Sequence, residues 1–156
     1  MSDLRPYQTD LVSRVEASPA QSVLLVLGTG AGKTRIAEEL TARTVARGGR
    51  VVFLADREEL VRQAHDRIGG TVVMGSYRPT PDVARPLSPG VTIASVATLA
   101  RRSEAPDATL VFADEAHLYA AASFRRVLEA YRSSGAKVVG LTATPDKRTF
   151  GFFFEN

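Results

Sequence analysis

The chain has 156 residues, 20 Lys and Arg against 17 Asp and Glu, and a formal net charge of +3. That length suits one domain, since a domain of this size buries roughly 70% of the surface of its unfolded chain. The sequence has no cysteine, which excludes disulfide bonds, thiolate metal sites and a cysteine nucleophile.

No signal-peptide pattern opens the chain, and no apolar run approaches the ~18 residues that a membrane span needs. We therefore expect an intracellular protein, cytoplasmic or nucleoid-associated, with no membrane partner. The basic residues are dispersed along the chain. This pattern is compatible with a polyanionic partner and equally with a solvated charged surface.

Apolar runs and helical spacings alternate along the chain. Apolar runs predict strands at 22–27, 51–55, 71–74, 91–95, 110–113 and 138–141. Helical spacings fall before Pro19, after the first strand to about Arg47, and over 60–68, 96–102 and 124–131. Such alternation predicts an α/β fold in three layers, with a mostly parallel sheet of about six or seven strands flanked by helices.

Two local signals refine this pattern. Residues 56–59 fit a capping box at the start of the third helix. The segment 75–90 contains four prolines and no usable periodicity, so we expect a long surface loop there.

A glycine-rich stretch follows the first predicted strand and opens a helical segment. It comprises Gly28, Thr29, Gly30, Ala31, Gly32, Lys33 and Thr34. Glycines let consecutive backbone N–H groups point into one hollow at a helix N-terminus, where phosphate binds. Lys33 would then lie over the β and γ phosphates, and the Thr34 hydroxyl would hold Mg²⁺. The alternative is a glycine-rich turn with a solvated lysine.

Polar residues also follow the fifth and sixth predicted strands. Asp114 and Glu115 suit magnesium-assisted phosphoryl chemistry, with Asp114 holding the metal and Glu115 polarising the attacking water. Alternatively, these two acids simply begin the next helix. His117, Thr142 and Thr144 could be ordinary surface and turn residues. Because ligands of open α/β sheets bind beyond the carboxyl ends of the strands, we expect all three polar clusters to lie at one edge.

Gln8 lies near the predicted start of the first helix. A glutamine side chain offers both a donor and an acceptor, which reading the edge of an adenine ring requires. The alternative is an ordinary surface residue.

Six stretches, in chain order, resemble the Q motif and motifs I, Ia, Ib, II (of the DEAH type) and III of the second superfamily of DNA and RNA helicases. They are 5–8, 28–34, 54–64, 92–99, 114–117 and 141–145. Within the superfamily, the sequence is most similar to the type III restriction, excision-repair and transcription-factor branch. The resemblance implies that residues 1–150 form a P-loop NTPase lobe of RecA-like fold. Residues 151–156 would be an apolar tail or the start of a linker to a second lobe.

The resemblance also implies roles for individual residues. Arg5 and Gln8 would meet the adenine of ATP, Lys33 and Thr34 the phosphates and Mg²⁺, and Asp114 and Glu115 the metal and the water. The residues that would couple the nucleotide state to nucleic acid are His117, Thr142 and Thr144, and those that would contact the DNA or RNA backbone are Arg57, Ser95 and Thr98.

Two functions therefore remain open from the sequence. The first is the ATP-binding lobe of a nucleic-acid-dependent ATPase, helicase or translocase, weak in isolation because a second RecA-like lobe, in cis or in trans, would supply an arginine finger. The second is a non-catalytic module that binds nucleotide or nucleic acid and needs a partner lobe or subunit.

Overall fold

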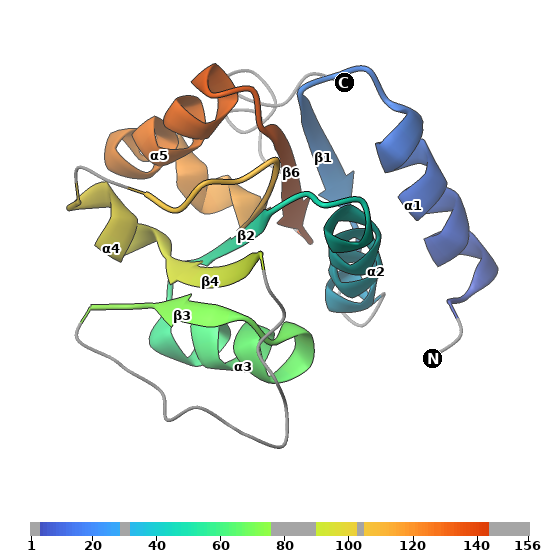
Figure 1. The fold of residues 1–156 in the computed structure, drawn as a ribbon, viewed down its shortest axis with the longest axis horizontal. Helices are drawn as coiled ribbons and strands as arrows, with labels where there is room; N and C mark the ends of the chain where they lie inside the picture. Colours follow the sequence, from blue (N-terminus) through green and yellow to red (C-terminus); the bar gives the residue numbers. More distant parts are fainter. Residues whose placement is uncertain (1–3, 29–31, 76–89, 103–104, 144–156) are drawn as a thin grey trace.

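Six apolar segments of the chain form one parallel sheet. The computed structural model describes residues 4–28, 32–75, 90–102 and 105–143. Within these ranges the strand order is β1-β6-β5-β2-β4-β3, and every neighbouring pair is parallel (Figure 1). The strands are β1 (Ser22–Val26), β2 (Val51–Ala55), β3 (Thr71–Val73), β4 (Val91–Ser95), β5 (Leu110–Asp114) and β6 (Lys137–Thr142). The predicted α/β fold with a parallel sheet is confirmed.

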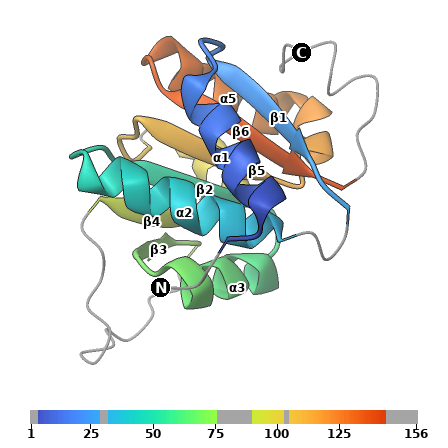
Figure 2. The ribbon, with the colours of Figure 1, turned by 90° about the vertical axis from the view of Figure 1, so that its right-hand side faces the viewer.

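Helices cover both faces of this sheet (Figures 1 and 2). One face carries α1 (Pro6–Ala17), α2 (Lys33–Ala46) and α3 (Glu58–Ile68). The other carries α4 (Val96–Ala100), the 3₁₀ helix η1 (Ala116–Ala120) and α5 (Ala122–Ser133). None of the helices in the described ranges has the length and apolar character to cross a membrane.

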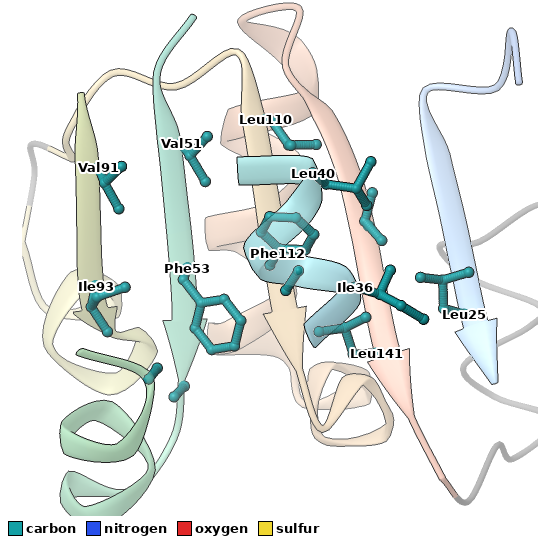
Figure 3. Close-up of a cluster of buried hydrophobic side chains, with 14 of the residues drawn as sticks. Leu25, Ile36, Leu40, Val51, Phe53, Val91, Ile93, Leu110, Phe112 and Leu141 are labelled. Atoms are coloured by element: carbon teal, nitrogen blue, oxygen red, sulfur yellow. The ribbon is translucent and has the colours of Figure 1, made fainter. Parts of the chain in front are cut away.

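Side chains that alternate along the central strands fill two cores. Along β2, Val51 and Phe53 face the α1–α3 layer, whereas Val52 and Leu54 face the α4–α5 layer. The first core, in which Phe112 packs 5.8 Å from Phe53 between ring centroids, is drawn in Figure 3. Both faces of a covered parallel strand are apolar, which explains why these strands appear in the sequence as continuous apolar runs.

The order of the sheet places the ends of three strands side by side. β6 pairs with β1 on one side and with β5 on the other. In this register Val26 lies opposite Thr142, and Leu141 lies opposite Asp114. Beyond the end of β1, the Leu27 N–H donates to the Thr142 carbonyl at 3.0 Å. The three strand ends that precede the predicted polar clusters are therefore neighbours.

Two expectations need correction or lie outside the structure. The predicted capping box at 56–59 is wrong. α3 begins at Glu58, and its N-cap, Arg57, makes no side-chain cap hydrogen bond. Asp56 lies one residue too early to cap the helix. Most of the expected loop, 76–89, and the predicted tail, 151–156, lie outside the described residues.

Ion pairs hold α1 against α2. Glu16 accepts from Arg43 of α2 and from Arg47, the C-cap of α2, each at 2.6 Å. Lys137 of β6 donates to the carbonyls of Val15 and Ser18 at the end of α1, where a cation is favoured by the helix dipole. These contacts position the helix that carries Gln8.

The charge of Glu16 makes stability depend on pH. Burial tends to raise the pKa of Glu16, but hydrogen bonds from Arg43 and Arg47 outweigh it and leave the pKa below its usual value of 4.5. The ionised carboxylate therefore stabilises the fold at pH values above 4.5, the usual pKa. This stabilisation is lost as the pH falls through the lowered pKa of the folded state.

We expect Glu16→Gln to lower the free energy of unfolding near neutral pH by about 1 kcal/mol or less, because the carboxylate is partly solvated. The difference from wild type should shrink below a pH of about 4, where wild type also loses the charge. Urea unfolding at both pH values measures it. Glu58→Gln is the control, because Glu58 pairs with Arg62 on a single exposed helix face. A Glu16→Gln difference that is independent of pH would contradict the assignment.

Candidate nucleotide site

The start of α2 lies at the edge formed by the strand ends. Gly32 is the N-cap with a left-handed φ of 83°, and Lys33 is the first helical residue. The first turn of α2 contains no acidic residue, so its own side chains do not neutralise the positive end of the helix dipole. Gly28 is exposed just beyond β1, whereas Thr29, Gly30 and Ala31 lie outside the described residues. This arrangement favours an anion at the edge.

Lys33 meets the residue that follows β5. Its Nζ lies 3.5 Å from Oε1 of Glu115, although 82 positions separate the two residues in the sequence. The side chains are 19% and 33% exposed, respectively. Both therefore remain open to solvent at the edge while they face each other.

The backbone of Glu115 is unusual. With φ 53° and ψ 57°, it is the one non-glycine residue in the described ranges with a positive φ. The left-handed conformation costs an L-residue roughly 1–2 kcal/mol. Strain of this kind is characteristic of functional sites, where the surrounding structure imposes it.

Thr34 and Asp114 share a hollow beside this ion pair. The hollow has a volume of about 360 Å³ and lies between α2, α3, the middle of β2 and the end of β5. Its other lining residues include Phe53 of β2 and Gln63 of α3. The structure thus brings together the two residues that we predict to bind metal.

The side chain of Gln8 lies between the cap of α1 and the glycine-rich turn. Gln8 is 5% exposed, and its Oε1 accepts from the Arg5 backbone N–H at 2.9 Å. A Cβ on Gly32 would overlap Gln8 Nε2. Arg5 itself is exposed. The predicted adenine-reading glutamine therefore packs against the turn that leads into α2.

Two of the predicted coupling residues lie near these groups. Thr142 is fully buried at the end of β6, where its carbonyl accepts from the Leu27 N–H. His117 lies within η1, directly after the strained Glu115, but its side chain is outside the described part. Thr144 also lies outside the described residues.

The three residues predicted to contact nucleic acid have different surroundings. Arg57 is exposed at the start of α3. Ser95 is 6% exposed and accepts from the Thr98 N–H, whereas Thr98 is 4% exposed and accepts from the Gly75 N–H at 2.9 Å. Both hydroxyls stabilise turns, and their contact with nucleic acid stays a prediction.

A family match covers most of the chain. The family model described as "Type III restriction enzyme, res subunit" (ResIII) matches residues 1–147. The chain belongs to this family. The resemblance to the second helicase superfamily is confirmed at the level of the family.

Individual relatives agree with this assignment. The endonuclease subunit of the type I restriction enzyme EcoKI from Escherichia coli K12 is 28% identical over 190 aligned positions, which cover 97% of this chain and 16% of that protein. The Hef helicase domain of Pyrococcus furiosus is 26% identical with a TM-score of 0.72, over 92% of this chain and 33% of that one.

A third relative supports the fold alone. The Sulfolobus solfataricus SWI2/SNF2 ATPase core, solved with double-stranded DNA, is 17% identical with a TM-score of 0.67, over 97% of this chain and 34% of that one. The ResIII chain therefore spans about a third or less of the length of these relatives.

Family membership implies ATP with a divalent metal, and the residues present fit both. Thr34 and Asp114 offer one hydroxyl and one carboxylate to the same hollow. Mg²⁺ prefers such hard oxygen ligands, keeps several waters and uses only one or two carboxylates. The described residues contain no group of three or more His, Cys, Asp or Glu side chains that could hold a metal.

Tyr119 is a site neighbour that sequence reasoning missed. It is 2% exposed, and its hydroxyl has no hydrogen-bond partner among the described residues. Burial, and then the charges of Asp114 and Asp56, raise its pKa well above the usual value. In the sequence Tyr119 resembles any core aromatic residue, because only the fold places its hydroxyl near both carboxylates.

The contact between Gly32 and Gln8 can be separated from backbone strain. We expect Gly32→Ala to lower the free energy of unfolding more than Gly48→Ala. Both glycines have a φ of 83°, but only at Gly32 does the new Cβ meet another side chain. The strain alone should cost about 1 kcal/mol. Urea unfolding of both variants, and of Gly32→Ala combined with Gln8→Ala, measures the extra cost, which the double variant should recover. Equal losses at the two glycines would contradict the contact.

The strain at Glu115 can be measured by comparing two substitutions that both remove the ion pair with Lys33. We expect Glu115→Gly to be more stable than Glu115→Ala by up to about 1 kcal/mol, because glycine adopts positive φ freely. The order should reverse at exposed Glu129 inside α5, where glycine costs about 1 kcal/mol relative to alanine. If urea unfolding shows the alanine variant to be the more stable one at both positions, Glu115 carries no strain.

Proposed function

We propose that this chain is the first ATP-binding lobe of a nucleic-acid-dependent ATPase, helicase or translocase, which couples Mg-ATP hydrolysis to binding of DNA. One observation supports this most directly. Lys33, at the start of α2, lies 3.5 Å from Glu115, after β5, and their neighbours Thr34 and Asp114 line one hollow. A lysine, a hydroxyl and two carboxylates at a helix N-terminus match the parts that phosphoryl transfer requires.

Each residue has a separate role in this proposal. Lys33 and the backbone N–H groups that begin α2 hold the phosphates by charge and hydrogen bonds. Thr34 and Asp114 hold the metal, directly or through water. Mg-ATP, when bound, supplies the scissile phosphoanhydride bond and the metal charge that offsets negative charge on the phosphates.

Glu115 orients and polarises the attacking water. Its carboxylate can accept a proton. The left-handed backbone of Glu115 places this carboxylate near Lys33. Arg5 and Gln8 bind the adenine. For this step, the Gln8 carbonyl has to exchange its bond with the Arg5 N–H for one with the base, because recognition of the adenine edge needs both donor and acceptor.

Coupling to DNA passes along the strand ends. The Thr142 carbonyl accepts from the N–H of Leu27, directly before the glycine-rich stretch. In this proposal Thr142 acts with His117 and Thr144 to link the nucleotide to the bound strand. Arg57 contacts the sugar-phosphate backbone. A second RecA-like lobe, in cis or in trans, completes the site with an arginine, which in comparable NTPases is worth about 10³ to 10⁵ in rate.

Nucleotide binding gives a direct test of the intact chain. We expect millimolar Mg-ATP to stabilise wild type, by about 2.7 kcal/mol at a hundred times Kd, and Lys33→Ala to lose most of that gain. Glu115→Gln breaks the same ion pair but keeps the lysine, so it should retain the gain. Arg47→Ala removes a cation from the other end of α2 and serves as the control. Thermal unfolding with and without Mg-ATP measures the stability of all four proteins. If Mg-ATP does not stabilise wild type, the proposal is wrong.

A further inference from the structure

A chain of ion pairs compensates several arginines of the α1–α3 layer. Glu16 of α1 pairs with Arg43 of α2 and with Arg47, the C-cap of α2, and Arg43 also pairs with Glu39 at 3.0 Å. The chain continues through three further contacts, which are Arg35 to Glu39 at 3.9 Å, Arg35 to Glu38 at 3.7 Å and Arg67 of α3 to Glu38 at 2.8 Å. The four arginines of this chain, Arg35, Arg43, Arg47 and Arg67, are therefore compensated.

The opposite layer has a hollow with a different charge balance. It lies between α4 and α5, which are side by side in Figure 1, and has a volume of about 220 Å³. Leu99, Val127 and Ala130 contribute its apolar part, and Arg102, Ser123 and Arg126 are exposed side chains of its lining. No carboxylate belongs to the described lining.

Within the described part of the chain, no carboxylate compensates the two arginines of the hollow. Among the described residues, neither Arg102 nor Arg126 forms an ion pair. Arg102 donates instead to the Gly75 carbonyl at 3.4 Å, a contact that orients a guanidinium without neutralising it. The adjacent Arg125, in contrast, is paired with Glu129.

The hollow begins near the edge that carries the candidate nucleotide site. α4 follows directly after the carboxyl end of β4, and α5 begins eight positions after Asp114 at the end of β5. Its helices cover the face of the sheet opposite to α2. A polymer that crosses the strand ends could therefore extend onto this layer.

We propose that Arg102 and Arg126 bind the sugar-phosphate backbone of a nucleic acid in the hollow between α4 and α5. A guanidinium binds phosphate oxygens bidentately, and two such groups with a nearby hydroxyl fit consecutive phosphates better than a point charge does. The choice of nucleic acid over another polyanion rests on the proposed function.

Direct binding tests this surface without ATP. The probe is a fluorescein-labelled DNA duplex of about 20 base pairs, with the same duplex in RNA as a second arm, titrated with the whole chain at several salt concentrations by anisotropy. We expect Arg102→Ala combined with Arg126→Ala to lower the slope of log K against log salt by about 2, in any duplex sequence. Arg102→Lys combined with Arg126→Lys should keep the slope, because both substitutions keep the positive charge.

The matched control removes the same net charge elsewhere. Arg14→Ala combined with Arg62→Ala deletes two exposed arginines of α1 and α3, each of which is already paired within its own helix. This control should keep the wild-type slope. An equal loss in the control, or an unchanged slope in the hollow variant, would overturn the inference.

Two further outcomes keep the proposals apart. If the hollow variant loses affinity for labelled polyglutamate but binds DNA as wild type does, the hollow takes acidic polypeptide and the inference fails. If the slope changes as expected while Mg-ATP leaves wild-type stability unaltered, the DNA surface stands and the proposed ATPase function fails. DNA and RNA that respond alike indicate recognition of the phosphates that both share.

Discussion

Backbone pairing of β6 between β1 and β5 is the constraint on which the candidate site depends. The parallel register aligns Val26 with Thr142 and Leu141 with Asp114, so the chain must leave all three strands at one edge. Lys33 can then reach Glu115 without any long loop. A shift of one residue in either pairing would turn alternate side chains to the opposite core, and for this reason the two apolar cores hold the polar residues in place.

The site combines electrostatic attraction with local strain. The helix N-terminus and Lys33 favour negative charge, and Glu115 supplies that charge from a backbone conformation that costs free energy. The buried hydroxyl of Tyr119 lies in the field of Asp114 and Asp56 without a hydrogen-bond partner among the described residues. Burial of the apolar side chains on both faces of β2 and β5 stabilises the fold by more than these costs. A rigid scaffold of this kind can hold a strained polar group in place.

The two helical layers divide the charge of a modestly basic chain. Ion pairs across α1, α2 and α3 stiffen the layer that carries Gln8 and Lys33, whereas the α4–α5 layer retains uncompensated arginines. Solvent-exposed pairs add little stability individually. Their larger effect here is on the potential around the molecule, because they compensate four arginines of the α1–α3 layer.

The sequence by itself determined the order of strands and helices and the glycine-rich and acidic motifs. It could do so because burial on both faces demands continuous apolar runs at β2 and β5, and because the left-handed N-cap of α2, Gly32, favours glycine. It misassigned the cap of α3, since a capping pattern does not set which residue begins the helix. Only the tertiary structure decided that Ser95 and Thr98 are buried, that Glu115 is left-handed, and that Tyr119 lies near two carboxylates. The physical reason is the same for all three. Each depends on side chains that are distant in the sequence and meet only after the sheet has formed.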